Sequence, residues 1–91
     1  MKNIIKDLKM RLGFYKTGYS YMVKLSDIVI PIEFEDNKPK KMFKKREYLR
    51  RNGKYESKVV LNRNFVLVDG YTTYILSTER DEKYVEAYFV D

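Results

Sequence analysis

Apolar residues in the first twelve positions recur every three or four residues, which is the spacing of an amphipathic helix. The pattern predicts a helix over residues 1–12 that ends at Gly13. Its apolar positions are Met1, Ile4, Ile5, Leu8 and Leu12, and its polar positions are Lys2, Lys6, Asp7, Lys9 and Arg11. We expect the apolar stripe to pack on the body of the domain, and a dimer contact or a membrane-surface helix is the alternative.

The segment from Tyr19 to Phe34 reads as extended chain. It opens with the period-two alternation of a half-buried strand, in which Tyr21, Val23 and Leu25 alternate with Met22 and Lys24. A turn at Ser26-Asp27 then precedes the apolar run 28–32. Pro31 limits that run to a sheet edge or a strand end, because proline cannot donate a ladder hydrogen bond.

A polar stretch, residues 33–41, leads into a strongly charged helix. Pro39 suits the first helical position, where its missing N–H has no partner in any case, and Asn52-Gly53 is a stop signal. The apolar stripe of this helix is weak and consists of Met42, Phe43 and Leu49, with Tyr48 at its margin. Residues 38–54 carry nine cations and one acid, Glu47; the cations are Lys38, Lys40, Lys41, Lys44, Lys45, Arg46, Arg50, Arg51 and Lys54.

The last third of the chain predicts a hairpin, a short helix and a closing strand. Two β-branched runs, 59–61 and 65–68, flank the loop Asn62-Arg63-Asn64, in which Asn tolerates positive φ. Asp69-Gly70 breaks the second run, and residues 71–82 form a helix with Tyr74, Ile75 and Thr78 facing inward. Residues 84–90 alternate as a strand, with Val85, Ala87 and Phe89 on one face and Tyr84, Glu86 and Tyr88 on the other.

These elements predict a single α+β domain over residues 1–91, with a small mixed sheet and three helices. Residues 1–14 would form an N-terminal amphipathic helix added to a core of residues 20–91. A chain this short buries only about 60% of its unfolded surface, so its core is thin. Nine Tyr and five Phe partly compensate, because aromatic side chains bury large areas.

The composition excludes several kinds of chemistry. The sequence contains no Cys and no His, which removes thiolate nucleophiles, disulfides, the commonest general base and the commonest transition-metal ligand. We therefore expect a binding module that is not an enzyme and that takes no metal and no cofactor. No run approaches the ~20 apolar residues of a membrane span, and the N-terminus lacks the features of a secretory signal. The expectation is a soluble, cytoplasmic protein.

The charge balance favours a polyanionic partner. Nineteen Lys and Arg against thirteen Asp and Glu give a net charge of +6, which suits nucleic acid, an anionic membrane face or an acidic protein. In the charged helix, Lys40, Lys44 and Arg51 fall along one side. Like charges at this spacing destabilise a helix, so a sequence that keeps them is expected to bind phosphates, and a charged solvent face is the alternative. The candidate phosphate contacts are Lys40, Lys41, Lys44, Lys45, Arg46, Arg50, Arg51 and Arg63, and Tyr48, Tyr55, Asn62 and Asn64 could add stacking or hydrogen bonds nearby.

From Val23 to Val90 the chain resembles the ParB/sulfiredoxin-like family. Residues 24–28, Lys-Leu-Ser-Asp-Ile, are similar to the family's opening strand with its L-x-D-I step, and residues 48–53 lie where the helix before the hairpin ends in a glycine. Residues 59–61 and 67–70 resemble the paired strands that run into the family's D-G-x-x-R box, and residues 84–90 resemble its closing strand. The resemblance implies a ParB-like core and an accessory protein of a bacterium, plasmid or phage.

The functional box departs from the family. In the family, an arginine after the glycine contacts nucleotide phosphates, and sulfiredoxins carry a reactive cysteine; here Thr73 and Tyr71 stand at those two positions. Gly70, Thr72 and Thr73 remain a candidate anion site, because backbone N–H groups open a helix there. The alternative is that Asp69 and Gly70 only make the turn into the helix, with a side-chain oxygen capping it.

One further cluster has a chemical reading. Glu33, Glu35 and Asp36 could hold Mg²⁺ for phosphodiester chemistry, but a solvated loop is the expected role.

Three hypotheses follow from the sequence. The first is a non-catalytic nucleic-acid-binding module of ParB-like fold that binds DNA or RNA. The second is a protein-interaction module, such as a phage-encoded regulator or inhibitor, that docks on an acidic protein surface or on another copy of itself as a homodimer. The third is a residual nucleotide-binding or nuclease activity at the Gly70 turn.

Overall fold

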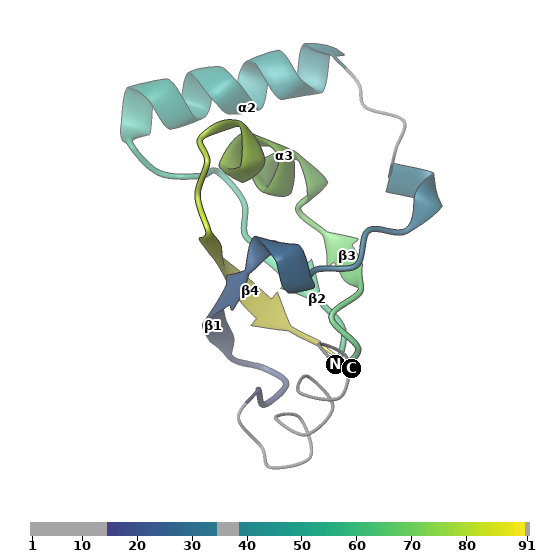
Figure 1. Ribbon diagram of the computed structural model, residues 1–91. Helices are drawn as coiled ribbons and strands as arrows, with labels where there is room; N and C mark the ends of the chain where they lie inside the picture. The colour runs from purple at the N-terminus through teal and green to yellow at the C-terminus, as the bar shows by residue number, and fades with distance from the viewer. Residues whose placement is uncertain (1–14, 35–38, 91) are drawn as a thin grey trace.

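The computed structural model describes residues 15–34 and 39–90. Four strands form one sheet in the order β1-β4-β2-β3 (Figure 1). β1 pairs antiparallel with β4, β4 runs parallel to β2, and β2 pairs antiparallel with β3, so the sheet is mixed as predicted. The strand bounds are β1 Ser20–Lys24, β2 Val59–Leu61, β3 Leu67–Asp69 and β4 Tyr84–Phe89.

Two α-helices and two short 3-10 helices accompany the sheet. They are η1 Leu25–Asp27, η2 Ile32–Phe34, α2 Pro39–Asn52 and α3 Tyr71–Glu79. The predicted α+β class is confirmed, and the described part of the chain contains two α-helices where three were predicted for the whole chain. The remaining helix, predicted over residues 1–12, lies outside the described residues. None of the described helices has the length and apolarity of a membrane span.

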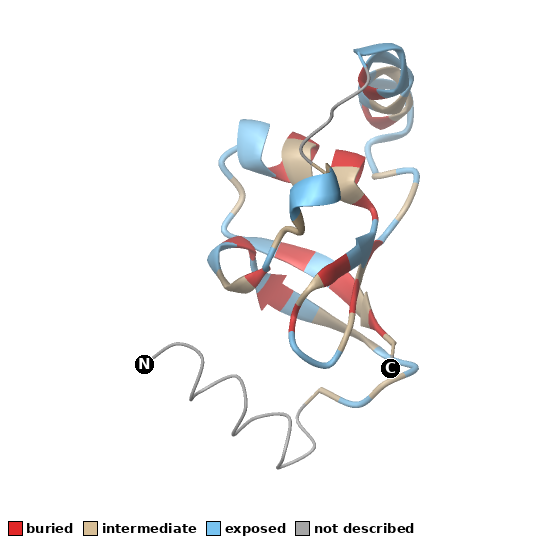
Figure 2. Cartoon of the chain, turned by 90° about the vertical axis from the view of Figure 1, so that its right-hand side faces the viewer, coloured by how far each residue is buried: buried red, intermediate tan, exposed pale blue. Residues whose placement is uncertain are grey.

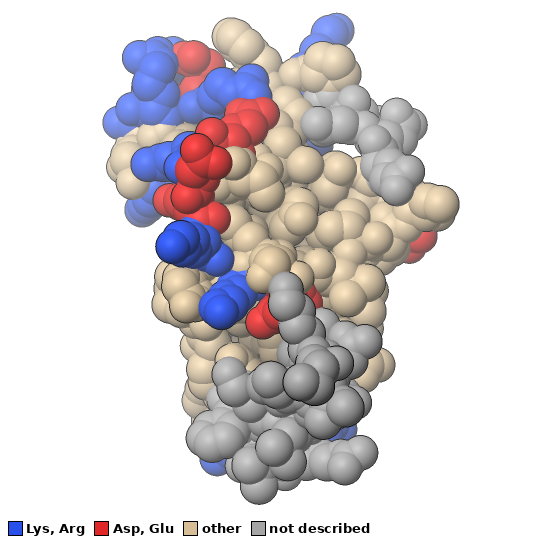
Figure 3. Space-filling view, viewed as in Figure 1, with Lys and Arg blue, Asp and Glu red and all other residues tan. Residues whose placement is uncertain are grey.

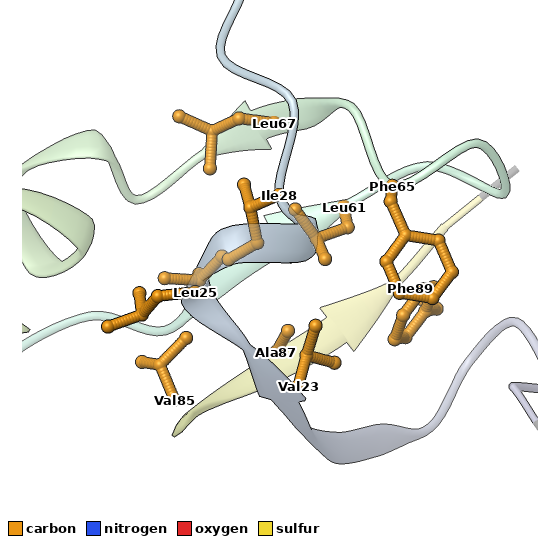
Figure 4. Close-up of a cluster of buried hydrophobic side chains, with 10 residues drawn as sticks. Val23, Leu25, Ile28, Leu61, Phe65, Leu67, Val85, Ala87 and Phe89 are labelled. Carbon is orange, nitrogen blue, oxygen red and sulfur yellow. The ribbon is translucent and has the colours of Figure 1, made fainter. Parts of the chain in front are cut away.

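The alternation along β4 produces the core, as the sequence predicts. Val85, Ala87 and Phe89 are buried, whereas Tyr84 and Glu86 on the other face are exposed. Because residues that lie opposite each other in neighbouring strands point to the same face, the buried residues of β4 align with buried residues on both sides. The main core cluster is Val23, Leu25, Ile28, Val59, Leu61, Phe65, Leu67, Val85, Ala87 and Phe89 (Figure 4).

Aromatic rings fill one end of this core. The ring of Phe89 has its centroid 5.2 Å from Phe65, 5.3 Å from Tyr15 and 5.8 Å from Tyr21. Edge-to-face pairs of this kind contribute about 0.5–1.5 kcal/mol each beyond the burial of their area. The aromatic residues that the composition singled out therefore serve as core here, and Tyr15 ties the start of the described chain to the sheet.

The apolar run after η1 differs from the expected strand. Only Val29 joins the sheet, where it forms a parallel bridge to Val66 at the edge next to β3. Its N–H donates to the Phe65 carbonyl at 2.9 Å. The position at an edge agrees with the constraint that Pro31 imposes. The chain then turns into η2, where the N–H of Phe34 donates to the Pro31 carbonyl at 3.1 Å.

The β2–β3 hairpin is present, but its backbone is not the one predicted. The positive φ falls on Phe65, at 64°, and not on an asparagine of the loop. The side-chain oxygen of Asn62 accepts hydrogen bonds from the N–H groups of Asn64 at 2.8 Å and Val66 at 3.1 Å. The asparagine therefore closes the turn through its side chain, and Phe65 takes the left-handed conformation in which its buried ring belongs to the core.

Helix α3 ends at Glu79, earlier than predicted, and buries a different face. Its buried residues are Thr72, Thr73, Leu76 and Ser77, whereas Thr78 is exposed and Tyr74 and Ile75 are partly buried. The physical reason is a close backbone crossing at Gly70. A Cβ at that position would lie 2.3 Å from the Lys58 carbonyl oxygen, so the first turn of α3 rests on the start of β2, where small side chains fit.

Candidate nucleic-acid interface

Helix α2 carries most of the predicted phosphate contacts and begins and ends where the sequence predicts. Pro39 is its first residue, and Gly53 follows its last with φ of 70°, which lets the Gly53 N–H donate to the Leu49 carbonyl at 2.8 Å. Met42 and Leu49 are buried in a second, smaller cluster with Leu76 of α3. Figures 1 and 2 show α2 at one extremity of the molecule, beyond α3.

The outer face of α2 bears a row of free cations. Lys40, Lys44 and Arg51 lie within about 40° of one another around the helix axis, because successive residues are about 100° apart. All three are exposed, and none of them forms an ion pair with an acid in the described part of the chain. Lys41 is also exposed and without such a pair. We call Lys40, Lys41, Lys44 and Arg51 the outer row.

Two other cations of α2 are matched by acids from distant parts of the chain. The Lys45 ammonium lies 2.8 Å from a carboxylate oxygen of Glu56, and the Lys45 side chain is only 19% exposed. The Arg46 guanidinium donates to both carboxylate oxygens of Glu79 on α3, at 2.9 and 3.0 Å. These cations therefore fasten α2 to the rest of the domain. The sequence gave no local signal for them, because the partners are 11 and 33 residues away.

A third cation is paired within the helix itself. Arg50 donates to both carboxylate oxygens of Glu47, at 3.3 and 2.7 Å. Chiefly because of this hydrogen bond, the pKa of Glu47 is lowered and that of Arg50 is raised from their ordinary values. Glu47 thus stays charged on the solvent side of α2 and offsets part of its positive field. Figure 3 shows the outcome, with acidic and basic side chains interleaved on one flank of the molecule.

Arg63 lies apart from the α2 surface. It is exposed in the β2–β3 turn, next to the C-terminal end of β4, where the N–H of Val90 donates to the Leu61 carbonyl at 2.8 Å. Figure 1 shows this turn and α2 at opposite ends of the molecule. The fold therefore does not bring Arg63 together with the other seven predicted contacts.

The tyrosines expected near the patch are engaged with the protein. Tyr48 is partly buried on α2, and the Tyr55 hydroxyl donates a short hydrogen bond to Glu82. Burial, followed by this hydrogen bond, raises the pKa of Tyr55 above its ordinary value of 10.0. The Arg80 guanidinium lies 5.8 Å from the centre of the Tyr55 ring. Tyr55 therefore packs beside α2 as a structural contact between the end of that helix and the end of α3.

The candidate anion site is filled by the protein's own hydrogen bonds. Gly70 caps α3 with φ of 86°, and its N–H donates to the Asp69 side chain at 2.8 Å. Asp69 thus makes the turn, although no side chain caps α3 in the predicted manner. Thr72 and Thr73 are both buried, and the Thr73 hydroxyl donates to the Ser57 carbonyl at 2.7 Å. The arrangement fixes α3 on the segment before β2.

The acidic cluster does not form a described metal site. Glu33 is exposed in η2, whereas Glu35 and Asp36 lie outside the described residues. Among residues 15–34 and 39–90, no group of three acidic side chains is placed to hold a metal ion.

Comparison with known proteins identifies the fold. Two solved structures of the pNOB8-like ParB N-domain, one of them in a C2221 crystal form, match 80% of this chain. Their TM-scores are 0.63 and 0.62, and their sequence identities are 22% and 21%. The chain spans 30% and 28% of the length of those two chains. No protein-family model matches the sequence, and a search of curated proteins finds no match. The ParB N-terminal-like fold predicted from the resemblance is confirmed.

Proposed function

We propose that this chain is a non-catalytic nucleic-acid-binding module, with the outer row of α2 as its phosphate-contacting surface. The observation that carries the proposal is that Lys40, Lys44 and Arg51 share one exposed side of a helix at an extremity of the molecule, where a long polymer can approach without meeting the rest of the domain. Contacts of Lys and Arg with phosphates release condensed counterions and give affinity that does not depend on sequence.

The charge distribution supports this surface over the rest of the protein. Lys45, Arg46 and Arg50 are paired with Glu56, Glu79 and Glu47, so their charges are largely offset locally. The outer row has no such offset from the described acids and is the concentration of charge that a polyanion would meet on α2. The absence of Cys and His from the sequence supports a role without thiol or imidazole catalysis. We propose a cytoplasmic accessory protein of a bacterium, plasmid or phage as its biological setting.

The proposal is tested by moving the same loss of charge between two surfaces. Replacing Lys40, Lys44 and Arg51 by Gln lowers the net charge from +6 to +3. Replacing Lys16, Lys24 and Lys83, which are exposed elsewhere, lowers it equally. Gel shifts with DNA and RNA at low salt should show lost binding for the first variant and near-normal binding for the second. Equal binding by the two variants, or no binding by the unmodified protein, would reject the proposal.

A second candidate, a protein-interaction module, rests on a different surface. Met22 and Tyr84 are exposed on the outer face of the sheet, opposite the core, where they flank the ion pair between Lys58 and Glu86. A mixed apolar and charged face of this kind suits a protein partner or a second copy of the chain. A defined complex that survives nuclease treatment and is lost in Met22→Glu would favour this candidate over the first.

A further inference from the structure

Phe43 is the feature of α2 that its packing leaves unexplained. The sequence places it in the apolar stripe, yet its side chain is 63% exposed, whereas Met42 beside it is buried. Successive helical residues are about 100° apart, so the stripe that reaches α3 through Met42 and Leu49 cannot also include Phe43. No aromatic ring contact with Phe43 is found among the described residues.

Cations lie on both sides of this ring. Lys40, three residues earlier, is about 60° to one side around the helix, and Arg46, three residues later, is about 60° to the other. Side chains at this spacing are neighbours on a helix surface. Lys44, the adjacent residue, belongs to the free outer row, and Arg46 is held in place by Glu79. The exposed ring is therefore set among positive charges and not within an apolar patch.

We infer that the polyanion bound by α2 is a single-stranded nucleic acid and that Phe43 stacks on one of its unpaired bases. This inference rests on the proposed function and narrows its ligand. A phenyl ring has no donor or acceptor with which to read a base edge, but it offers a face on which any base can stack. In a duplex the base faces are covered by neighbouring bases, so an exposed ring gains this contact only from a single strand.

The same geometry places phosphates beside the stacked base. With the base over Phe43, the strand's backbone passes along the outer row, where Lys40 and Lys44 are exposed and free of ion pairs with described acids. An aromatic platform beside cations that follow the backbone is the usual composition of sites for single strands without sequence preference. The site should therefore accept DNA and RNA single strands and favour neither by base sequence.

The test compares one labelled single strand with the duplex of equal length, using fluorescence anisotropy. The unmodified protein should prefer the single strand, and Phe43→Ala should weaken single-strand binding about 5- to 150-fold, the range measured for loss of one stacked base. Duplex binding and the salt dependence should change little, because no charge is removed. Tyr84→Ala is the matched control, since Tyr84 is an exposed aromatic (48%) on the outer face of the sheet and should have no effect.

A second variant gives a direct readout of stacking. The chain contains no Trp, so Phe43→Trp introduces a single tryptophan whose fluorescence should be quenched by a bound single strand and not by a duplex. The inference is overturned if Phe43→Ala binds the single strand normally, or loses single strand and duplex to the same extent. Tight duplex binding that depends on Lys40, Lys44 and Arg51 would reject the inference and keep the proposed function, whereas no binding of either ligand would reject both.

Discussion

Gly70 offers a sharp test of how the fold is held together, because a second glycine serves as its control. Both Gly70 and Gly53 have left-handed backbones, with φ of 86° and 70°. A Cβ on Gly53 would meet nothing within 4 Å, whereas a Cβ on Gly70 would lie 2.3 Å from the Lys58 carbonyl oxygen and 2.8 Å from the Cα of Val59. The two Gly→Ala variants therefore share the backbone strain and differ in the clash.

The cost of each change follows from these contacts. The left-handed conformation costs an L-residue about 1–2 kcal/mol, which is the full effect expected for Gly53→Ala. Gly70→Ala should cost about 1–3 kcal/mol more, the usual range for overpacking, because the atoms that it meets are backbone and cannot rotate away. Each kcal/mol lowers the melting temperature of a domain this size by about 4–8 °C.

Thermal unfolding followed by circular dichroism, together with urea titration, measures the difference directly. Gly70→Ala should melt at least several degrees below Gly53→Ala, or fail to fold. If the two variants are equally stable, the close crossing of the β3–α3 turn over the start of β2 is not present in the protein, and the account of the buried face of α3 falls with it.

Three further predictions concern other contacts. Glu79→Gln frees Arg46, so gel shifts should show tighter nucleic-acid binding, while the free energy of unfolding changes by less than about 1 kcal/mol because the pair is half exposed; weaker binding would contradict the assignment of this face. Phe89→Ala removes a fully buried ring and should cost about 3–5 kcal/mol in urea titration, against a small effect of Val68→Ala at an exposed position; similar losses would argue against the core described here. Because the pKa of Tyr55 is raised in the folded protein, its stabilising effect is present below its ordinary value of 10.0 and is lost as the pH rises through the folded pKa. The stability advantage of the unmodified protein over Tyr55→Phe should therefore decline above pH 10, and an advantage that grows there would contradict the direction of the shift.

Local signals in the sequence were sufficient for much of the fold. The bounds of α2 follow from Pro39 and Gly53, since each acts through its own backbone conformation. The buried face of β4 follows from strict alternation, which gives the same answer whichever strands flank it. The resemblance to ParB-like chains supplied the family of folds, which these local signals could not.

What could not be predicted depends on contacts between distant residues. The small residues of α3 face inward because the crossing at Gly70 brings the helix against β2, a fact that hydrophobicity alone does not reveal. In the same way, the counter-ions of Lys45 and Arg46 are acids far away in the chain, so a count of charges overestimates the free charge of α2. Phe43 was assigned to the core because it is apolar, and the position of Leu76 on α3 decides otherwise.

The measurement that bears most directly on the central claim is the salt dependence of nucleic-acid affinity before and after Lys40, Lys44 and Arg51 are replaced by Gln. Each phosphate contact contributes about 0.7 to a plot of log affinity against log salt concentration for a single strand, and about 0.9 for a duplex. Three lost contacts should therefore make the slope shallower by about 2 to 3. An unchanged slope would show that nucleic acid, if bound at all, does not contact the outer row of α2.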